Sequence, residues 1–472
     1  MTTVTTAPGI YVEEDATPAI SVSATATAVP LFIGSFTPVD SGNTDKIIRV
    51  SSWLDFTTKF LAQISANITI TSTAPTPPAQ EDVTTDLSSD DNASTSDVVP
   101  RKAKTKAKTK TARALTEGEY SYAINTVSTS LSAWRNLQLY FQNGGGACYI
   151  CATTDSTDLT TLTGLVAETP AATLLVCADA DVDVREKVYG SLSSLVSEGS
   201  TAGVFLLADS NDGKTVSGIS QSSHVAAYYP SLVVSTTLLT GSEVLVSGYA
   251  DADTEETDLT LAEVKSRNPV LAAQITSRLN SDSANTLTAP ASVAVAGVWC
   301  ANDNTRGVWK APANVVLNGI SDLSVQVTDD AQGAMNEAGI NVIRYFSDRG
   351  YVVWGARTLE NDDNWRYIPV RRLFDAAERD IKKALRPMVF ETNNQPTWQR
   401  VYTAVDNYLY SLWQKGALAG NKPADAWFVQ IGKDITMTDA DINQGKMIVV
   451  VGMAAVRPAE FIILQFTQNM SS

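Results

Sequence analysis

The chain has 472 residues, 44% of them apolar, and a net charge of −16 that arises from 35 Lys+Arg against 51 Asp+Glu. This length fits about two to four domains, and the acidic balance argues against general binding to nucleic acid, which requires a basic face. The longest apolar run, Met447–Val456, is far shorter than the roughly 20 residues of a membrane span. The beginning of the chain lacks the basic and apolar regions of a secretion signal, and the four Cys do not indicate a disulfide framework, so we expect synthesis in a reducing cytoplasm.

Residues 1–30 are predicted to form an extended N-terminal arm. A Pro-Gly turn at Pro8–Gly9 precedes a short strand-like stretch, Ile10–Val12. Residues 19–29 are mostly Ala, Ser, Thr and Val, which favours an extended strand with too little bulk to anchor itself in its own core. Leu31–Phe36 then predicts the first buried strand.

Residues 65–118 are predicted to be an exposed insertion. They are rich in Thr, Ser, Pro and Ala, with an acidic block at 81–97 and a basic block at 101–113 that contains the run KAKTKAKTK. A basic run of this kind is compatible with binding to nucleic acid or anionic lipid. We favour the alternative, a segment solvated by its own charges.

The remaining sequence predicts an α/β (α+β) fold. Apolar runs and helical periodicity predict strands at 147–152, 174–177 and 204–208, and a helix at 184–196. The C-terminal part predicts a short strand at 352–354, a helix at 371–386 ended by Pro387, a second helix that follows Pro396 and is stopped by Gly416, and late strands at 446–451 and 461–466. Strands that alternate with helices indicate a sheet covered by helices.

Patterns that carry chemistry are incomplete. His224 is the only histidine available as a general base, and we interpret it as a packed or surface residue. Cys148 and Cys151 form a CxxC, but positions i and i+3 of a strand point to opposite faces, which favours buried, unpaired thiols. We therefore predict no catalytic residue, no metal site and no cofactor.

Two further motifs have structural interpretations. The glycine run at 144–146 leads into a strand, whereas a dinucleotide-binding loop opens a helix, so it predicts a tight turn. Asp179, Asp181 and Asp183 imitate the start of a calcium loop, but the later positions of that loop are wrong. We expect these acids to favour the beginning of the following helix.

A set of ordered motifs resembles the contractile tail sheath family. The stretch 297–314, GVWCANDNTRGVWKAPAN, is similar to the family pattern AGxxAxxDxxRGVWKAPAN. Further matches are PGIYVEE at 8–14, GINVIR at 339–344, VWGARTL at 353–359, WRYIPVRR at 365–372, GALAG at 416–420 and RPAEF at 457–461. The forms of residues 16–36 and 461–470 most resemble the larger sheath paralogues of antifeeding-prophage-type extracellular contractile injection systems.

The resemblance implies a particular domain organisation. A tube-facing α/β domain is built from N-terminal residues 31–64 and C-terminal residues 346–472, and a subtilisin-like α/β domain at 119–345 faces outward. The arm at 1–30 and the end of the chain extend to neighbouring subunits, whereas the insertion at 65–118 has no counterpart in minimal sheaths.

The resemblance also implies a structural function. Subunits of the family form stacked six-fold rings around an inner tube and contract to drive the tube through a target envelope. The expected partners are further copies of the chain, sheath paralogues, the inner tube protein, and baseplate and cap proteins, without nucleic acid or direct membrane insertion. The expected location is the bacterial cytoplasm and then a released phage tail-like particle. A baseplate or cap adaptor with the same core is the alternative, and a hydrolase is disfavoured because His224 is the only possible histidine base.

Two groups of residues are candidates for contacts in such an assembly. The residues expected in arm strands that add to sheets of neighbouring subunits are Ala19, Ile20, Val22, Ala24, Ala26, Val29, Phe461, Ile463, Leu464 and Phe466. The candidates for the tube contact are Arg379, Lys382, Lys383, Arg386 and Lys415. The helix at 371–386 is equally compatible with an ordinary solvated surface that carries Asp375–Arg379 and Glu378–Lys382 pairs.

Overall fold

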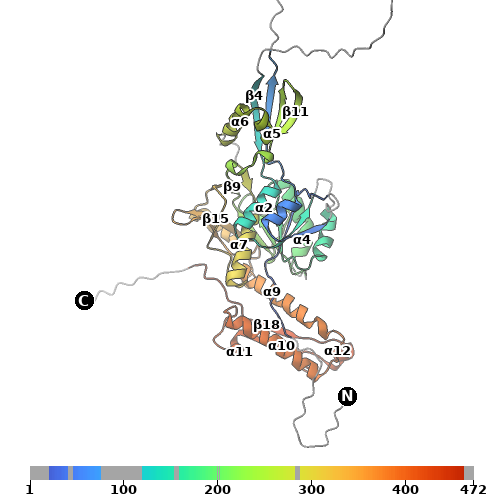
Figure 1. Cartoon of the computed structure of the whole chain (residues 1–472). Helices are drawn as coiled ribbons and strands as arrows, with labels where there is room; N and C mark the ends of the chain where they lie inside the picture. Colours follow the sequence, from blue (N-terminus) through green and yellow to red (C-terminus); the bar gives the residue numbers. More distant parts are fainter. Residues whose placement is uncertain are drawn as a thin grey trace, which may run out of the picture. The chain divides into compact units, whose positions relative to one another are not determined.

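The computed structural model describes residues 21–40, 46–75, 120–153, 159–198, 200, 202–281 and 287–461. The chain divides into two compact units (Figure 1). Unit 1 draws on residues 1–65, 129–238 and 286–472, and unit 2 on residues 66–128 and 239–285. Both units therefore combine segments that are far apart in the sequence.

A nine-stranded sheet organises unit 1. Its strands are β1 (Pro30–Gly34), β2 (Ile47–Val50), β5 (Cys148–Ala152), β6 (Leu174–Cys177), β7 (Phe205–Asp209), β8 (Val225–Tyr229), β13 (Val315–Val316), β15 (Ile340–Phe346) and β16 (Gly350–Trp354). They lie in the order β13-β16-β15-β8-β7-β6-β1-β5-β2. The strands from β15 to β5 are parallel, and β2, β16 and β13 extend the sheet with antiparallel pairings.

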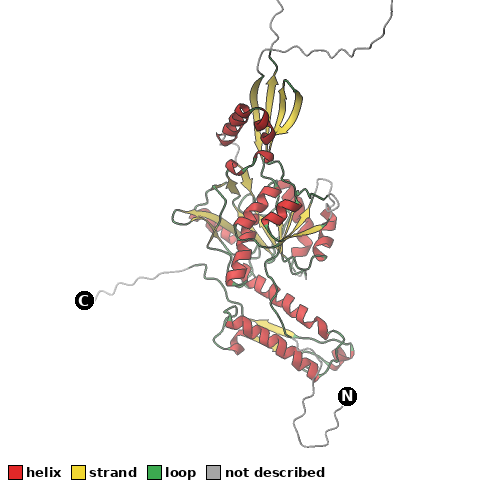
Figure 2. Cartoon of the chain, viewed as in Figure 1, coloured by secondary structure: helices red, strands yellow, loops and turns green. Residues whose placement is uncertain are grey.

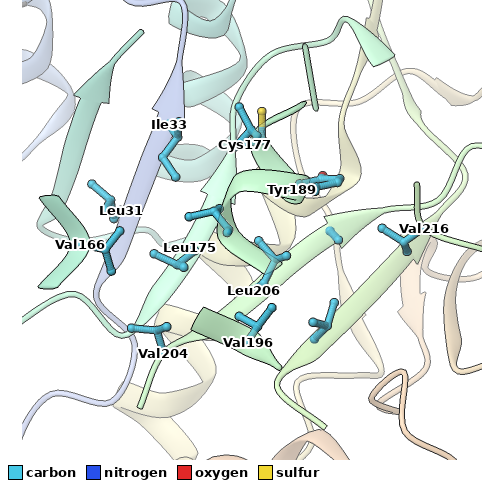
Figure 3. Close-up of a cluster of buried hydrophobic side chains, with 14 of the residues drawn as sticks. Leu31, Ile33, Val166, Leu175, Cys177, Tyr189, Val196, Val204, Leu206 and Val216 are labelled. Atoms are coloured by element: carbon cyan, nitrogen blue, oxygen red, sulfur yellow. The ribbon is translucent and has the colours of Figure 1, made fainter. Parts of the chain in front are cut away.

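Helices cover both faces of this sheet, which explains why its central strands are almost continuous apolar runs. The covering helices are α2 (Ala133–Gln142), α3 (Leu162–Ala167), α4 (Val182–Val196) and α7 (Ala291–Arg306). Leu31 and Ile33 of β1 belong to one buried cluster with residues of α3 and α4, among them Val166 (Figure 3). Phe32 lies between them on the opposite face, where its ring centroid is 4.8 Å from that of Tyr140 in α2. Each such buried side chain stabilises the fold by about 1.5–3 kcal/mol.

The C-terminal part of unit 1 consists of long helices and a small sheet (Figure 2). Its elements are α9 (Ile368–Leu385), the 3₁₀ helix η5 (Arg386–Met388), α10 (Gln395–Gln414), α11 (Pro423–Ala426), β17 (Trp427–Gln430), α12 (Asp439–Asn443) and β18 (Val450–Met453). Leu373 and Ala377 of α9 share a buried cluster with Val401 and Val405 of α10 and Trp427 of β17. Helical spacing of these apolar residues places them on the facing sides of the two helices.

Several short elements complete unit 1. They are α1 (Trp53–Lys59), η2 (Leu159–Thr161), β9 (Leu232–Val234), η3 (Thr236–Leu238), β12 (Leu287–Ala289), β14 (Asp322–Leu323) and α8 (Asp329–Glu337), of which β12, β9 and β14 form a three-stranded sheet in that order. Among the described residues of the chain, no helix is both long enough and apolar enough to cross a bilayer.

Unit 2 is a four-stranded sheet packed on two helices. Its elements are β3 (Ala66–Thr73), β4 (Ser121–Thr129), η4 (Gly241–Glu243), β10 (Val244–Asp251), β11 (Thr254–Thr260), α5 (Leu261–Arg267) and α6 (Pro269–Ser281), with strand order β11-β10-β3-β4. Ala66, Ile68 and Ile70 of β3 are buried in a cluster with residues of α5 and α6. Asn67 and Thr69 alternate with them and are exposed, as expected for a strand with one covered face.

Most of the predicted elements are confirmed. The predicted strand at 174–177 coincides with β6, and the predicted helix at 184–196 lies within α4. The strands predicted at 31–36, 147–152, 204–208 and 352–354 correspond to β1, β5, β7 and β16. The long C-terminal helices are also present: α9 ends before Pro387, and Gly416 follows α10 with a φ of 76° that favours glycine.

The predicted insertion is wrong at its beginning. Residues 66–73 form β3, which pairs with β10 in parallel and contributes to the core of unit 2. Alternation of Ile and Thr in this segment is typical of a half-buried strand, but its Thr and Ser content suggested a solvated loop. The charged blocks at 81–97 and 101–113 lie outside the described residues.

Other boundaries also differ from the prediction. The strand expected at 446–451 begins only at Val450 in β18, and the described part of residues 19–29 contains no strand. The compact units do not follow the expected division at 118/119 and 345/346, because residues 239–285 separate from the rest of 119–345 and join β3 and β4. Strand pairing between distant segments determines this grouping.

If β3 is part of the core of unit 2, Ile68→Ala should destabilise that unit, because Ile68 is fully buried. We expect a loss of about 2–4 kcal/mol in the free energy of unfolding, from lost burial and the cavity that remains. Thr69→Ala, on the exposed face of the same strand, should change it by less than about 0.5 kcal/mol. Urea unfolding of the two variants measures the difference, and equal effects would contradict the assignment of β3.

Candidate functional site

Residues 21–29, which we call the N-terminal strap, are fastened to the long C-terminal helices. Thr25 donates its backbone N–H and its hydroxyl to Oδ1 of Asp380 in α9, at 3.1 and 2.5 Å. The other oxygen of Asp380 accepts the hydroxyl of Tyr408 in α10 at 2.8 Å. Burial, followed by the negative charge of Asp380, raises the pKa of Tyr408, so its hydroxyl remains a donor at neutral pH. Asp380 thus joins the strap to two helices.

A buried ion pair lies beside the strap, between Asp303 of α7 and Arg372 of α9. The guanidinium donates to both carboxylate oxygens, at 3.0 and 2.6 Å, and each side chain is only 3% exposed. Arg372 also lies 4.3 Å from the ring centroid of Trp299 and donates to the backbone oxygen of Thr27 at 3.2 Å. The hydroxyl of Thr27 donates to Asp303 at 2.5 Å. Because the pair has these further partners, its burial is less costly than that of an isolated pair.

The strap is therefore anchored, although the sequence predicts too little bulk for residues 19–29 to anchor themselves in a core of their own. Hydrogen bonds from threonine hydroxyls provide the attachment, and Val22 adds an apolar contact with the cluster of α9 and α10. Ala24 and Ala26 are exposed, and the backbone N–H of Val29 donates to Thr173 at 2.9 Å. The candidates Ala19 and Ile20 lie outside the described residues.

The two-stranded sheet of β17 and β18 has one buried face and one partly exposed face. Trp427 and Val429 of β17 face the cluster of α9 and α10. Phe428 lies opposite Gly452 on the other face and is 52% exposed, and Val450 is 39% exposed. Within the described parts of the chain this sheet has no third strand. Its two edges therefore carry main-chain groups that are suited to pairing with an added strand.

The chain after β18 is held at Glu460. Arg357 donates from Nε to Oε1 at 3.0 Å and from Nη2 to Oε2 at 2.6 Å. Asn336 donates to Oε1 at 3.0 Å, and the hydroxyl of Tyr367 donates to Oε2 at 3.3 Å. Burial acts to raise the pKa of Glu460, but these donors and the charge of Arg357 outweigh it and lower the pKa below its usual range. The next residue, Phe461, is 73% exposed, and the candidates Ile463, Leu464 and Phe466 lie outside the described residues.

The C-terminal end of α9 is a cationic surface. Lys382, Lys383 and Arg386 are exposed, near the helix terminus where positive charge is favourable. The next turn carries Val389 and Phe390, which are 62% and 103% exposed. Lys415, at the end of α10, is exposed as well.

Arg379 differs from the other tube-contact candidates. Its guanidinium donates to Thr25 and to the backbone oxygen of Ala26, both at 3.4 Å, so it covers the strap. Burial lowers the pKa of Arg379 relative to a solvated guanidinium. The predicted Asp375–Arg379 pair is wrong, because Asp375 pairs with Arg371 at 2.6 Å. The predicted Glu378–Lys382 pair is absent from the ion pairs of the described residues, where Glu378 lies 3.4 Å from Arg371.

His224 is a packed histidine, as predicted. Its Nε2 lies 3.4 Å from Asp375, and its Nδ1 lies 3.4 Å from the hydroxyl of Ser223. Burial acts to raise the pKa of Asp375, but the hydrogen bond from His224 and the charge of Arg371 lower it. This buried arrangement joins the beginning of β8 to α9.

The remaining chemical motifs have structural roles. Cys148 and Cys151 are buried on β5, as predicted. Asp181 caps α4 by accepting from the backbone N–H of Val184 at 3.0 Å, and the glycine run at 144–146 connects α2 to β5. In the described ranges no group of three or more His, Cys, Asp or Glu side chains is arranged to hold a metal ion.

The residues that fix the strap and the C-terminal segment are not among the candidates predicted from the sequence. Arg357, Arg372 and Glu460 lie within the motifs VWGARTL, WRYIPVRR and RPAEF, and Asp303 lies within 297–314. Asp303 is a charged residue near the end of the apolar helix α7, and this position is a signal in the sequence that it has a structural role. Its partner was not identifiable locally, because 69 residues separate it from Arg372.

Removal of one member of the buried ion pair should be costly. Asp303→Ala leaves the charge of Arg372 buried without its partner, for which we expect a loss of about 3–5 kcal/mol in the free energy of unfolding. The control is Asp363→Asn, since Asp363 pairs with Arg366 but is 82% exposed. That change should cost less than about 1 kcal/mol. Chemical unfolding compares the two variants, and a small effect of Asp303→Ala would show that the pair is not important for stability.

Comparison with known proteins places these features in a family. The family model described as "Phage tail sheath protein central domain" matches residues 244–359, and "Phage tail sheath C-terminal domain" matches residues 360–469. The tail sheath protein of Vibrio phage KVP40 is 27% identical over 128 residues, which are 26% of this chain and 19% of that protein. A putative prophage major tail sheath protein of Pseudomonas aeruginosa is 33% identical over 91 residues, which are 18% of this chain and 24% of that protein. These alignments thus span about a quarter or less of the curated relatives.

Solved structures match over almost the whole chain. A chain of the anti-feeding prophage helical sheath in its contracted state is 44% identical with a TM-score of 0.69, and a chain of the anti-feeding prophage baseplate is 45% identical with a TM-score of 0.67. Each alignment covers 99% of this chain and 100% of the other. A chain of the PVC sheath complex in its contracted state, from an extracellular contractile injection system, is 34% identical with a TM-score of 0.62 and 99% coverage of both chains. The mixed α/β fold, the motifs and these matches over the full length together show that the chain belongs to the contractile tail sheath family, in its anti-feeding-prophage type.

Proposed function

We propose that the chain is a structural sheath subunit that polymerises as stacked six-fold rings around an inner tube and contracts to drive the tube through a target envelope. Its similarity to chains of contracted sheaths supports this function. The observation that carries the proposal is the combination of a two-stranded sheet with two edges and terminal segments fixed at the strap and at Glu460. A subunit of this kind both offers sheet edges and supplies strands.

The proposed linkage between subunits is addition of arm strands to the sheet of β17 and β18. Main-chain hydrogen bonds make such an addition strong with little dependence on side chains. The buried face of that sheet, with Trp427 and Val429, is continuous with the core of α9 and α10, so an added strand extends an existing apolar layer. The candidate strands are the N-terminal arm, proposed from the sequence with Ala19–Val29, and residues 461–466 after Glu460.

The proposed tube contact is the cationic end of α9, with Lys382, Lys383 and Arg386. Screened charge pairs suit a surface that aligns with the tube and later releases it, because they are weaker and more dependent on salt than a dry apolar interface. Lys415 is a further candidate. Arg379 is a weaker one, because its guanidinium is engaged with the strap.

The other parts of the proposal follow from this structural role. The subunit is non-enzymatic, is synthesised in the bacterial cytoplasm and becomes part of a released phage tail-like particle. Its partners are further copies, sheath paralogues, the inner tube, the baseplate and the cap. The alternative is a baseplate or cap adaptor on the same core. The similarity to a chain in the anti-feeding prophage baseplate supports this alternative. Electron micrographs of the purified protein distinguish long helical polymers from discrete rings.

The proposed arm strand is tested by prolines in the full-length chain. Ile463→Pro with Leu464→Pro removes two successive N–H groups, which point to opposite edges of a strand, so pairing on either edge is blocked. We expect the amount of sedimenting polymer to fall at least about tenfold, which corresponds to roughly 1.4 kcal/mol per contact. Ile463→Val with Leu464→Ile keeps the strand propensity and should polymerise normally. Normal polymers of the proline variant would refute the proposed linkage.

The proposed tube contact is tested by charge reversal. Lys382→Glu, Lys383→Glu and Arg386→Glu together should leave the fold intact, because all three side chains are exposed. Co-assembly with preformed tubes should weaken, most strongly at low salt where charge interactions are least screened. The control, Lys187→Glu with Lys214→Glu and Lys265→Glu, makes the same change in net charge at other exposed positions. Equal co-assembly of both triple variants would move the tube contact elsewhere.

A further inference from the structure

The contacts of Glu460 point to a role beyond stability. Val456 is bonded through its backbone N–H to Ala417 at 3.2 Å, next to the sheet of β17 and β18. Only about four residues later, Glu460 is bound by Arg357, which follows β16 of the nine-stranded sheet. Residues 456–460 therefore cross from one sheet of unit 1 to the other, and Phe461 is 73% exposed directly after the second attachment. Glu460 is thus the last fixed point of the described chain.

We propose that Arg357, Asn336 and Tyr367 form a carboxylate cradle that fixes the root of the C-terminal arm, so that the arm begins at a defined position and direction when it joins a second copy of the chain. This inference rests on the proposed function, because it presumes that the arm links subunits. It assigns to Glu460 and Arg357 the role of positioning the C-terminal arm for assembly. The cradle itself belongs to the same subunit as the arm.

The cradle is built rigidly from the centre of unit 1. Asn341 of β15 is fully buried, and its side chain accepts from the backbone N–H of Arg357 at 2.7 Å and donates to its carbonyl oxygen at 2.8 Å. Gly355 is required for this approach, since a Cβ atom there would lie only 2.8 Å from the side-chain oxygen of Asn341. An isolated bridge also pairs Arg357 with Tyr367. The position of Arg357 is therefore set by the sheet and does not depend on Glu460.

The chemistry of the cradle selects a carboxylate. The planar guanidinium of Arg357 matches the two oxygens of Glu460 with a two-point contact, which is stronger and more directional than a single hydrogen bond. Its Nη1 is occupied by the backbone oxygen of Asn336 at 2.9 Å, which fixes the plane of the group. The adjoining cavity, lined by Gly339, Glu360 and other residues, has a volume of about 10 Å³, enough for about one water molecule. The cradle itself is filled by the carboxylate of Glu460.

Release of Glu460 would change the geometry of the arm. The last attachment would move back to Val456, and about four residues, or about 13 Å of extended chain, would be added to the free arm. A longer free segment lowers the effective concentration of the arm strand at a neighbouring sheet and widens its range of directions. The fold around the cradle should persist, because Asn341 holds the backbone of Arg357.

The inference is tested with Glu460→Gln and Arg357→Lys in the full-length chain. Glu460→Gln keeps the shape but removes the charge, and Arg357→Lys keeps the charge but loses the two-point contact. Asp329→Asn is the control, because it removes a carboxylate from an ion pair of unit 1 in which the acid, the partner of Arg344, is 87% exposed. The measurements are the melting temperature and the critical concentration for polymer formation.

For both test variants we expect a rise of about tenfold in critical concentration, as for the loss of one charge-assisted contact. Melting temperatures should fall by no more than a few degrees, and Asp329→Asn should change neither quantity. Unchanged critical concentrations, while the proline variant at 463–464 fails to polymerise, would overturn this inference and leave the proposed function standing. Normal polymerisation of the proline variant would overturn the arm linkage and the inference with it.

Discussion

The ion pair between Asp303 and Arg372 is the interaction on which the arrangement of unit 1 depends. It joins α7, which covers the nine-stranded sheet, to α9, which begins the C-terminal layer. Both groups are almost fully buried, so neither is tolerable without the other and without the additional contacts from Trp299 and Thr27. Because the ion pair needs both Trp299 and Thr27, it specifies how the sheet layer, the C-terminal layer and the strap fit together. Apolar packing alone would specify this arrangement less strictly.

The same principle applies where the ends of the chain leave the body. Asp380 holds the strap through Thr25, and Arg357 holds the C-terminal segment through Glu460. Charged or hydrogen-bonded contacts of this type are directional, so they fix the position and direction of a segment that has little apolar surface. In the proposed function, the two terminal segments are fixed where they leave the body. The arms beyond these points can then move while the body keeps its fold.

The histidine and a buried cysteine are part of the packing around these helices. His224 contacts Asp375, which also binds Arg371, and the three groups connect β8 to α9 in the interior. Burial raises the pKa of the Cys300 thiol to about 11, which keeps it protonated and unreactive at neutral pH. These residues thus extend the packing around α7 and α9.

The sequence by itself determined the elements with a strong local pattern and the family. The continuous apolar runs of β6 and β7, the helical periodicity of α9 and α10, and the ordered motifs at 297–372 are readable because their signals lie within a few residues. The tertiary structure decided which segments pair. The Thr-rich start of the expected insertion became β3 because it has a partner in β10, and Arg379 turned to the strap instead of the surface. Thr25 and Asp380 are 355 residues apart and Arg357 and Glu460 are 103 apart, and no local periodicity records a contact over such separations.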